Sequence, residues 1–257
     1  MKVASFNVNG IRSRLGILSD WILDEEPAIL CLQETKVQDR DFPTEVFDDL
    51  SLHAVYWGEK SYNGVAIVSR SEPEEVTRGL GDTRETEEAR LISARIDGIW
   101  VVNTYIPQGT AVDSPRFRLK LQWFERLARY FQTYFEPSDP VLWMGDLNVA
   151  PEDRDVFDPK RLAGQVCFHP DEKKALAEVL SWGFRDVFRK HEPGEKQFSF
   201  FDYRLPLSAE RGLGWRLDHI LATEPLAKKS TRAWIDKAPR LKPKPSDHTP
   251  ICAEFTP

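Results

Sequence analysis

Apolar and polar positions divide the chain into short apolar runs and longer amphipathic stretches. The runs are rich in branched side chains and are bounded by turn residues, a pattern typical of β-strands. They span residues 2–6, 28–32, 64–69, 91–96, 100–106, 141–144, 198–201, 215–222, 230–235 and 251–255. The pattern therefore predicts a fold built on many strands.

Three amphipathic stretches between these runs have their apolar residues at helical spacing. The apolar residues of the first are Leu15, Leu18, Trp21 and Ile22. The longest spans residues 116–135, and the third spans residues 171–182 and ends at Gly183. Many strands with helices packed outside them predict an α/β sandwich.

The stretch at 116–135 has one apolar helix face, which we expect to join the core. The residues on that face are Leu119, Trp123, Leu127, Tyr130 and Phe131. The charged residues placed elsewhere on the helix are Lys120, Arg126 and Arg129.

No Gly/Ser tract, low-complexity block or long run of like charge interrupts the chain, so we expect one domain over residues 1–257. The opening MKVASFNVNG turns polar after six residues and offers neither a signal peptide nor a membrane span. We therefore expect a cytoplasmic protein. Cys31, Cys167 and Cys252 lack the spacing of a zinc site or a disulfide framework and are expected to be buried thiols.

The net charge is −6, from 35 basic and 41 acidic side chains, which argues against sequence-independent coating of nucleic acid. An enzyme with a carboxylate-rich metal centre is acidic at its active site, however, and needs cations only where it meets phosphates. Composition therefore leaves nucleic acid open as a substrate.

Polar side chains that can bind metal or phosphate recur at the ends of the predicted strands. They are Asn7, Asn9, Gln33, Glu34, Tyr105, Asp146, Asn148, Asp218, Asp247 and His248. Strand ends reach the rim of a sheet, where a rigid scaffold presents them to a substrate. Each residue alone has an ordinary explanation, such as a turn or a cap. Their joint occurrence predicts one shared site.

Oxygen ligands dominate this set. Magnesium prefers oxygen, keeps several waters and typically takes one or two carboxylates together with a substrate phosphate. Glu34 suits that role, with Asp247 as a second ligand, and the chain has no Cys/His cluster at zinc spacing. The pattern favours a hard-cation site.

His248 requires a carboxylate to orient its ring, and Asp218 is the candidate because it ends an apolar strand-like run. His219 is the alternative histidine, but strand alternation puts it on the opposite face from Asp218. A paired imidazole can stabilise phosphate charge or move protons. We prefer His248 for this role.

Seven segments, in order along nearly the whole chain, resemble the successive motifs of the exonuclease III family of apurinic/apyrimidinic (AP) endonucleases. They are FNVNGIR (6–12), LQETK (32–36), NGVAI (63–67), NTYIPQG (103–109), GDLNVAP (145–151), GWRLDHI (214–220) and SDHTP (246–250). The resemblance implies a four-layered α/β sandwich, with two mixed β-sheets packed face to face and helices outside. It also implies two similar halves, but NVN at 7–9 and LNV at 147–149 are too short to establish that repeat.

The resemblance assigns roles to the polar residues. The implied metal residues are Glu34, Asn7 and Asp247, and the implied catalytic residues are Tyr105, Asp146, Asn148, Asp218 and His248. Asp146 would activate or orient the attacking water, assisted by Asn148. Tyr105 would contact the scissile phosphate. The implied cofactor is Mg²⁺, with Mn²⁺ as a substitute.

Two stretches have side chains suited to DNA. Residues 237–248 place four cations on a proline-stiffened loop that runs into the candidate site, although a solvated loop would look the same. Residues 198–216 mix aromatic side chains with arginines. The resemblance points to Phe200, Trp215 and Leu217 as walls of a pocket for a base-free sugar, with core packing as the alternative. It also places Lys36, Tyr62 and Arg90 near backbone phosphates, and Gln108 stands where some relatives carry Asn.

We therefore expect a metal-dependent phosphodiester hydrolase that repairs DNA. Its expected main activity is cleavage 5′ to abasic sites in double-stranded DNA, as a monomer, with 3′–5′ exonuclease and 3′-phosphodiesterase activity beside it. One alternative is a phosphatase or phosphodiesterase of the wider endonuclease/exonuclease/phosphatase superfamily with a non-DNA substrate. The other is a catalytically inactive DNA-binding module.

Overall fold

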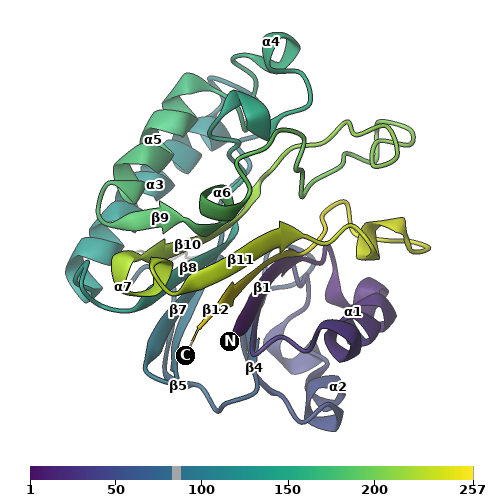
Figure 1. Ribbon diagram of the computed structural model, residues 1–257, viewed down its shortest axis with the longest axis vertical. Coiled ribbons are helices and arrows are strands. Elements are labelled where there is room, and N and C mark those ends of the chain that lie inside the picture. The colour runs from purple at the N-terminus through teal and green to yellow at the C-terminus, as the bar shows by residue number, and fades with distance from the viewer. Residues whose placement is uncertain (83–87, 257) are drawn as a thin grey trace.

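Two six-stranded β-sheets pack face to face, and helices cover their outer faces (Figure 1). The computed structural model describes residues 1–82 and 88–256. Branched side chains from both sheets, among them Val3, Ile67, Leu142 and Ile220, form one buried core between the sheets. The four-layered α/β sandwich expected from the sequence is confirmed.

The first sheet draws its strands from both ends of the chain. Its order is β11 (Ser230–Ile235), β12 (Ile251–Phe255), β1 (Lys2–Asn7), β2 (Ile29–Gln33), β4 (Val65–Ser69) and β3 (His53–Trp57). Strands β1 and β2 are parallel and all the other neighbours are antiparallel. The sheet is therefore mixed, as expected.

The second sheet is built from the middle of the chain. Its order is β5 (Glu74–Arg78), β6 (Leu91–Ile96), β7 (Ile99–Tyr105), β8 (Val141–Asp146), β10 (Asp218–Thr223) and β9 (Phe184–Asp186). Here β7 and β8 are the parallel pair, and the others are antiparallel. Both sheets thus place one parallel pair in the third and fourth positions, which makes β1 and β2 the counterparts of β7 and β8.

Each sheet has its own helices, on opposite sides of the molecule in Figure 1. Helices α1 (Ile11–Glu25) and α2 (Thr44–Asp49) pack on the first sheet through a core that includes Leu18, Trp21 and Phe47. Helices α3 (Pro115–Tyr134) and α5 (Pro170–Leu180) pack on the second through Trp123 and Leu127. This arrangement produces the two outer layers.

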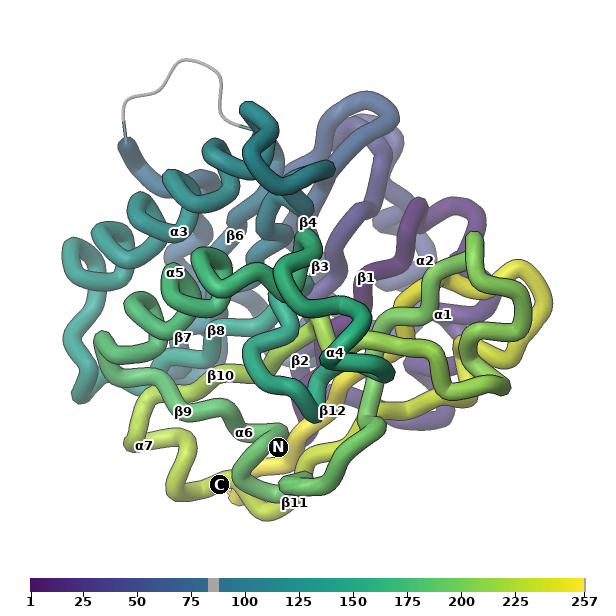
Figure 2. The backbone as a smooth tube through the Cα atoms, turned by 90° about the horizontal axis from the view of Figure 1, so that it is seen from above, coloured from purple at the N-terminus to yellow at the C-terminus, as the bar shows by residue number. Residues whose placement is uncertain are grey.

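Shorter elements occupy the connections. They are η1 (Asp39–Asp41), η2 (Asp153–Asp155), α4 (Pro159–Leu162), α6 (Val187–His191), α7 (Glu224–Ala227) and η3 (Pro239–Leu241). The two chain ends lie close together in Figures 1 and 2, where the Met1 amino group donates to the Phe255 carbonyl at 2.6 Å. Across the described parts of the chain, no helix is long and apolar enough to cross a bilayer.

Three details differ from the sequence expectations. The run 198–201 is not a strand, because only Phe200 pairs, through isolated bridges to Trp215 and His248. The next run becomes a strand only at Asp218. Leu119, expected in the core, is 39% exposed, whereas Lys120 and Arg126 on the same helix are buried. Their charges are paired, Lys120 with Glu172 and Arg126 with Asp82, so burial leaves neither cation uncompensated.

Candidate functional site

The ends of equivalent strands from the two sheets meet at one edge of the sandwich. Asn7 ends β1, Tyr105 ends β7 and Asp146 ends β8, while Glu34 directly follows β2. Because a parallel pair presents both carboxyl ends at the same edge, two such pairs packed face to face bring four polar residues together. One hollow of about 440 Å³ is lined by Glu34, Tyr105 and Asp146, among others.

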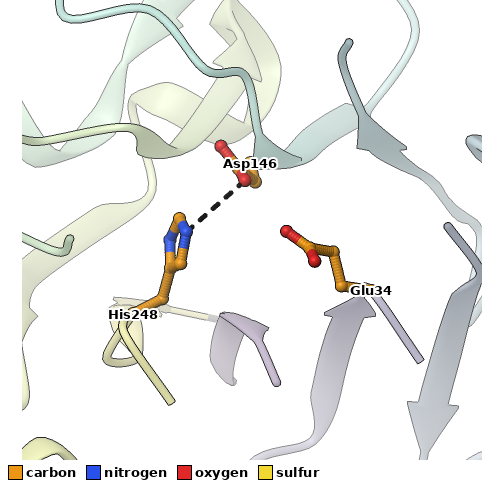
Figure 3. Close-up of side chains that lie close together, drawn as sticks. All are labelled: Glu34, Asp146 and His248. Atoms are coloured by element: carbon orange, nitrogen blue, oxygen red, sulfur yellow. Dashed lines mark ion pairs between the residues drawn. The ribbon is translucent and has the colours of Figure 1, made fainter. Parts of the chain in front are cut away.

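Glu34, Asp146 and His248 form the centre of this hollow (Figure 3). One donor atom of each lies within 4.8 Å of the others. His248 Nε2 is 3.7 Å from Asp146 Oδ2, and both side chains are almost fully buried. These three residues are separated widely in sequence and come from different strand ends.

Asn7 joins the two carboxylates. Its Nδ2 donates to Glu34 Oε1 at 2.8 Å and to Asp146 Oδ2 at 2.9 Å. One amide group thus fixes the spacing between the two acids and partly offsets their repulsion. Asn7 is itself completely buried at the end of β1.

His248 is held by two acids. Its Nδ1 contacts Asp218 Oδ2 at 2.8 Å, as expected from the sequence. Burial alone would lower the pKa of His248, but the negative charges of Asp218 and Asp146 outweigh burial and raise it. The raised pKa favours the protonated ring, which is hydrogen-bonded to Asp218 on one side and faces the hollow on the other.

Asp146 and Asn148 form one compact turn. The Asn148 backbone N–H donates to Asp146 Oδ1 at 2.9 Å, and Asn148 Nδ2 donates to the Ile106 carbonyl at 2.9 Å. Asn148 adopts φ 51°, the left-handed region that Asn tolerates better than most residues. Burial raises the pKa of the Asp146 carboxyl above its ordinary value, which His248 only partly counters. A carboxylate of raised pKa is a better proton acceptor near neutral pH.

Gly145 explains why this turn sits so close to β7. Its φ is +147°, and a Cβ at this position would lie 2.0 Å from the Thr104 carbonyl oxygen. Only glycine lets β8 approach β7 in the register that places Asp146 beside Tyr105. The GD pair of the motif is therefore a geometric requirement of the site.

Tyr105 is a partly buried phenol beside an arginine. Burial and the nearby charges of Glu34 and Asp146 raise the pKa of Tyr105 well above its ordinary value, so its hydroxyl stays protonated and can donate. The Arg90 guanidinium lies 4.8 Å from the Tyr105 ring centroid and donates to its carbonyl at 3.2 Å. Arg90 also pairs with Glu88 and is only 8% exposed.

A second chain of contacts links Lys36 to Asp247. Lys36 Nζ lies 2.7 Å from Glu34 Oε2 and donates to Asn9 Oδ1 at 2.5 Å, and Asn9 Nδ2 donates to Asp247 Oδ1 at 2.9 Å. Burial would raise the pKa of Glu34, but Lys36 and Asn7 lower it overall. Asn9 was among the strand-end polar residues, yet sequence reasoning gave it no role.

Another strand-end candidate, Gln33, lies away from the hollow. Gln33 points between the sheets, where its Nε2 donates to Asn103 Oδ1 at 2.7 Å. Asn103 Nδ2 donates in turn to the Leu32 and Ala66 carbonyls at 2.8 Å each. Gln33 is therefore part of a hydrogen-bond network that links the two sheets across the core.

A larger hollow of about 920 Å³ adjoins the first. Gln108, Phe200 and Leu217 line both hollows, and Trp215 lines the larger one. The structure therefore brings Phe200, Trp215 and Leu217 together around this larger hollow, with Gln108 beside them. Tyr62 is a 72% exposed side chain that lines neither hollow.

The donor set at the centre fits Mg²⁺. Carboxylates suit a hard cation, and the Glu34 side chain keeps 16% exposure while already facing the ammonium of Lys36. His248 is the third member of this group, and its Nδ1 is already held by Asp218. Asp247 stands outside the group of three close donors and is tied to Asn9.

Two close carboxylates beside a histidine, set at the edge of two stacked sheets, are the arrangement that metal-assisted phosphoester hydrolases require. The chain belongs to the endonuclease/exonuclease/phosphatase family, whose family model matches residues 4–248.

Individual relatives are similar over their full length. Exodeoxyribonuclease III of Haemophilus influenzae is 36% identical over 99% of this chain and 100% of that protein. The structure of an AP endonuclease from Archaeoglobus fulgidus is 49% identical, with a TM-score of 0.96, over 99% of both chains. A 3′ phosphatase, NExo, from Neisseria, solved with product DNA hairpin, is 35% identical with a TM-score of 0.95, over 100% of this chain and 99% of that one.

Proposed function

We propose that this protein is a Mg²⁺-dependent DNA-repair nuclease that hydrolyses the phosphodiester 5′ to an abasic site in double-stranded DNA, with 3′–5′ exonuclease and 3′-phosphodiesterase activity beside it. The observation that carries the proposal is the continuity of the two hollows. The acidic centre at Asp146 opens directly into a space walled by Phe200, Trp215 and Leu217. The named activities of the relatives point to the same chemistry.

Glu34 would hold the metal, with Asn7 fixing the carboxylate and Asp247 supporting the site through Asn9. A bound Mg²⁺ would neutralise charge on the scissile phosphate. Lys36 already balances Glu34 and would move toward a phosphate oxygen when the carboxylate is shared with the cation. This exchange of partners costs little because the lysine side chain is long and partly exposed.

The remaining residues would perform the hydrolysis. Asp146 would accept a proton from the attacking water, which Asn148 helps to orient. The protonated His248, steadied by Asp218, would stabilise negative charge developing on the phosphate. The Tyr105 hydroxyl would donate to the same group. Together these groups meet the demands of in-line displacement at phosphorus.

Recognition would depend on shape and charge around the centre. The apolar walls suit a sugar without a base, because a normal nucleotide in a duplex is held by stacking and pairing. Gln108, at the junction of the two hollows, would contact the sugar or a phosphate oxygen. Lys36, Tyr62 and Arg90 would contact backbone phosphates.

We further propose that residues 1–257 form one catalytic domain, since both sheets contribute side chains to the hollow around Asp146, and that it acts as a monomer. The three cysteines are buried and unpaired, which is compatible with a reducing compartment such as the cytoplasm.

The test compares a duplex carrying one abasic site with an intact duplex, each with Mg²⁺, with Mn²⁺ or with EDTA. We expect metal-dependent incision 5′ to the abasic site and slower shortening of the intact duplex from its 3′ ends. Binding of both duplexes without turnover in any metal would instead indicate an inactive DNA-binding module. Turnover of a lipid or inositol phosphate alone would indicate a phosphatase.

A further inference from the structure

A buried ion pair lies directly behind the candidate site. Lys120 of α3 and Glu172 of α5 are in contact, and neither side chain has any exposure. Sequence analysis placed Lys120 away from the core, and none of the roles assigned above includes it. Both ions lose their hydration here, which costs free energy that an apolar pair of similar volume would avoid.

The lysine uses its other hydrogen bonds on two loops of the site. Lys120 Nζ donates to the Asn148 carbonyl at 2.7 Å and to the Gln108 carbonyl at 3.1 Å. Its aliphatic stem lies beneath Gly109, where an added Cβ would meet Lys120 Cδ at 3.4 Å. One cation therefore ties together the loop after β8 and the loop after β7.

Glu172 anchors that cation in turn. Its Oε2 accepts the backbone N–H of His169 at 3.0 Å, at the N-terminus of α5, while its other oxygen meets Lys120. The carboxylate is thus fixed at both oxygens. The link runs from helix α5 through Glu172 and Lys120 to the two loops of the site.

We propose that Lys120 is a positioning residue, which with Glu172 sets the Asn148 and Gln108 loops at the distance that turnover requires. The inference deepens the proposed function and rests on it. Asn148 is in the left-handed region at φ 51°, and its Nδ2 donates to the Ile106 carbonyl at 2.9 Å and to Asp146 Oδ2 at 3.3 Å. Releasing its carbonyl would let that turn relax and move the amide away from Asp146.

The test variant is the double substitution Lys120→Met/Glu172→Gln, which removes both charges while conserving volume. Glutamine can still accept the His169 N–H, so α5 keeps its cap. The matched control is Arg126→Met, which removes another buried cation of α3, paired with Asp82 and bonded to neither loop. We expect kcat on abasic DNA to fall about 10- to 100-fold in the double variant, with KM little changed. The control should keep the wild-type kcat.

A double-mutant cycle with Asn148→Ala distinguishes a positioning effect on Asn148 from a loss of activity that has another cause. If Lys120 acts through Asn148, most of the loss caused by the double variant disappears in the Asn148→Ala background. An equal loss in both backgrounds would overturn the proposal, because it would reflect a change that does not pass through Asn148.

Hydrogen exchange provides a readout that does not depend on turnover. Peptides covering 106–110 and 146–150 should exchange faster in the double variant than in wild type or in Arg126→Met. Unchanged exchange in both peptides would refute the positioning role. Wild-type protein that cleaves no DNA would refute the proposed function instead, and the exchange comparison would still decide whether this ion pair holds the loops.

Discussion

Asp146 and Glu34 share one hollow but have different proposed tasks. Replacing Asp146 by Asn keeps the size of the side chain and removes the proton acceptor, but it leaves one oxygen where two now accept hydrogen bonds from Asn7 and Asn148. We expect kcat to fall roughly 10²–10⁴-fold, with DNA affinity nearly unchanged. Single-turnover cleavage and equilibrium DNA binding would measure the two quantities. Wild-type turnover would show that Asp146 is not the base.

Glu34→Gln makes the complementary change at the same centre. Because a neutral amide is a weaker ligand for Mg²⁺, the concentration of metal that supports half-maximal cleavage should rise at least about 10-fold. A metal titration of the cleavage rate measures this shift directly. If Glu34→Gln and Asp146→Asn needed the same metal concentration for half-maximal cleavage, this result would argue against Glu34 as the ligand.

His219, the alternative histidine in the sequence, has a structural role that predicts a pH effect. Its Nδ1 lies 3.0 Å from Arg216 Nη1, and its Nε2 lies 3.0 Å from the Val149 carbonyl. Burial and the charge of Arg216 lower the pKa of His219 from 6.5 to about 4, although Asp186 and Asp155 oppose the shift. The folded ring is therefore neutral at pH 7.

The sign of the effect follows from proton binding. Between pH 6.5 and 4 the unfolded chain binds a proton at this histidine and the folded chain does not, so folding stability is lost as the pH falls through that window. His219→Gln should make folding stability depend less on pH in this window. Urea unfolding at several pH values would test it, with the exposed His53→Gln as control, and an unaltered slope in His219→Gln would refute the assignment.

Single residues were predictable where a local pattern sufficed. Alternation along the strand separated Asp218 from His219, and the structure places these side chains among different partners. Asn9 and Lys120 could not be assigned in this way. The Asn9 side-chain partners, Lys36 and Asp247, are 27 and 238 positions away, and no periodicity in the sequence encodes such contacts.

At the scale of elements, apolar runs predicted the buried strands well, but an exposed strand with polar residues was missed. Strand β5 is exposed along its whole length, so no buried face left a pattern to detect. The run 198–201 looked like a strand because it is aromatic. Phe200 instead lines both hollows and lies 4.9 Å from the His248 imidazole, while the buried rings of Phe198 and Phe201 pack edge to face against each other. Aromatic content alone does not distinguish a strand from the wall of a site.

The loop after β11 carries an element-scale prediction. Lys242 and Lys244 are exposed and lie only a few residues before Asp247. If both contact phosphates, Lys242→Gln/Lys244→Gln should lower the slope of log affinity against log salt by about 0.9 per lysine, with kcat at saturating DNA unchanged.

Lys229 provides the matched control for that loop. It is exposed and follows α7. Helix α7 begins where β10 ends, whereas Asp218 is the first residue of that strand. Lys229→Gln should leave the salt slope unchanged. Equal slopes in the loop variant and in wild type would mean that the loop is only solvated.

At the scale of the whole molecule, the sequence indicated the sandwich but not its internal repeat. The two sheets share one pairing pattern, and Asn7 and Tyr105 end counterpart strands, as do Gln33 and Asp146. The repeat was hidden because equivalent strands occur in a permuted order along the chain. Equivalent positions also carry different residues, since one half supplies Glu34, the proposed metal ligand, and the other supplies Asp146, the proposed base.

Strand order has a consequence for synthesis. All strands of the second sheet come from one continuous stretch, Glu74–Thr223. In the first sheet, β1 pairs with β12, which is the last strand to be synthesised. A chain emerging from the ribosome can complete the second sheet while the first still lacks two strands. His248 lies just before β12, so it arrives late. The nascent chain therefore holds Glu34 and Asp146 before it holds the histidine, and the group of three close side chains is complete only after residue 248 has been made.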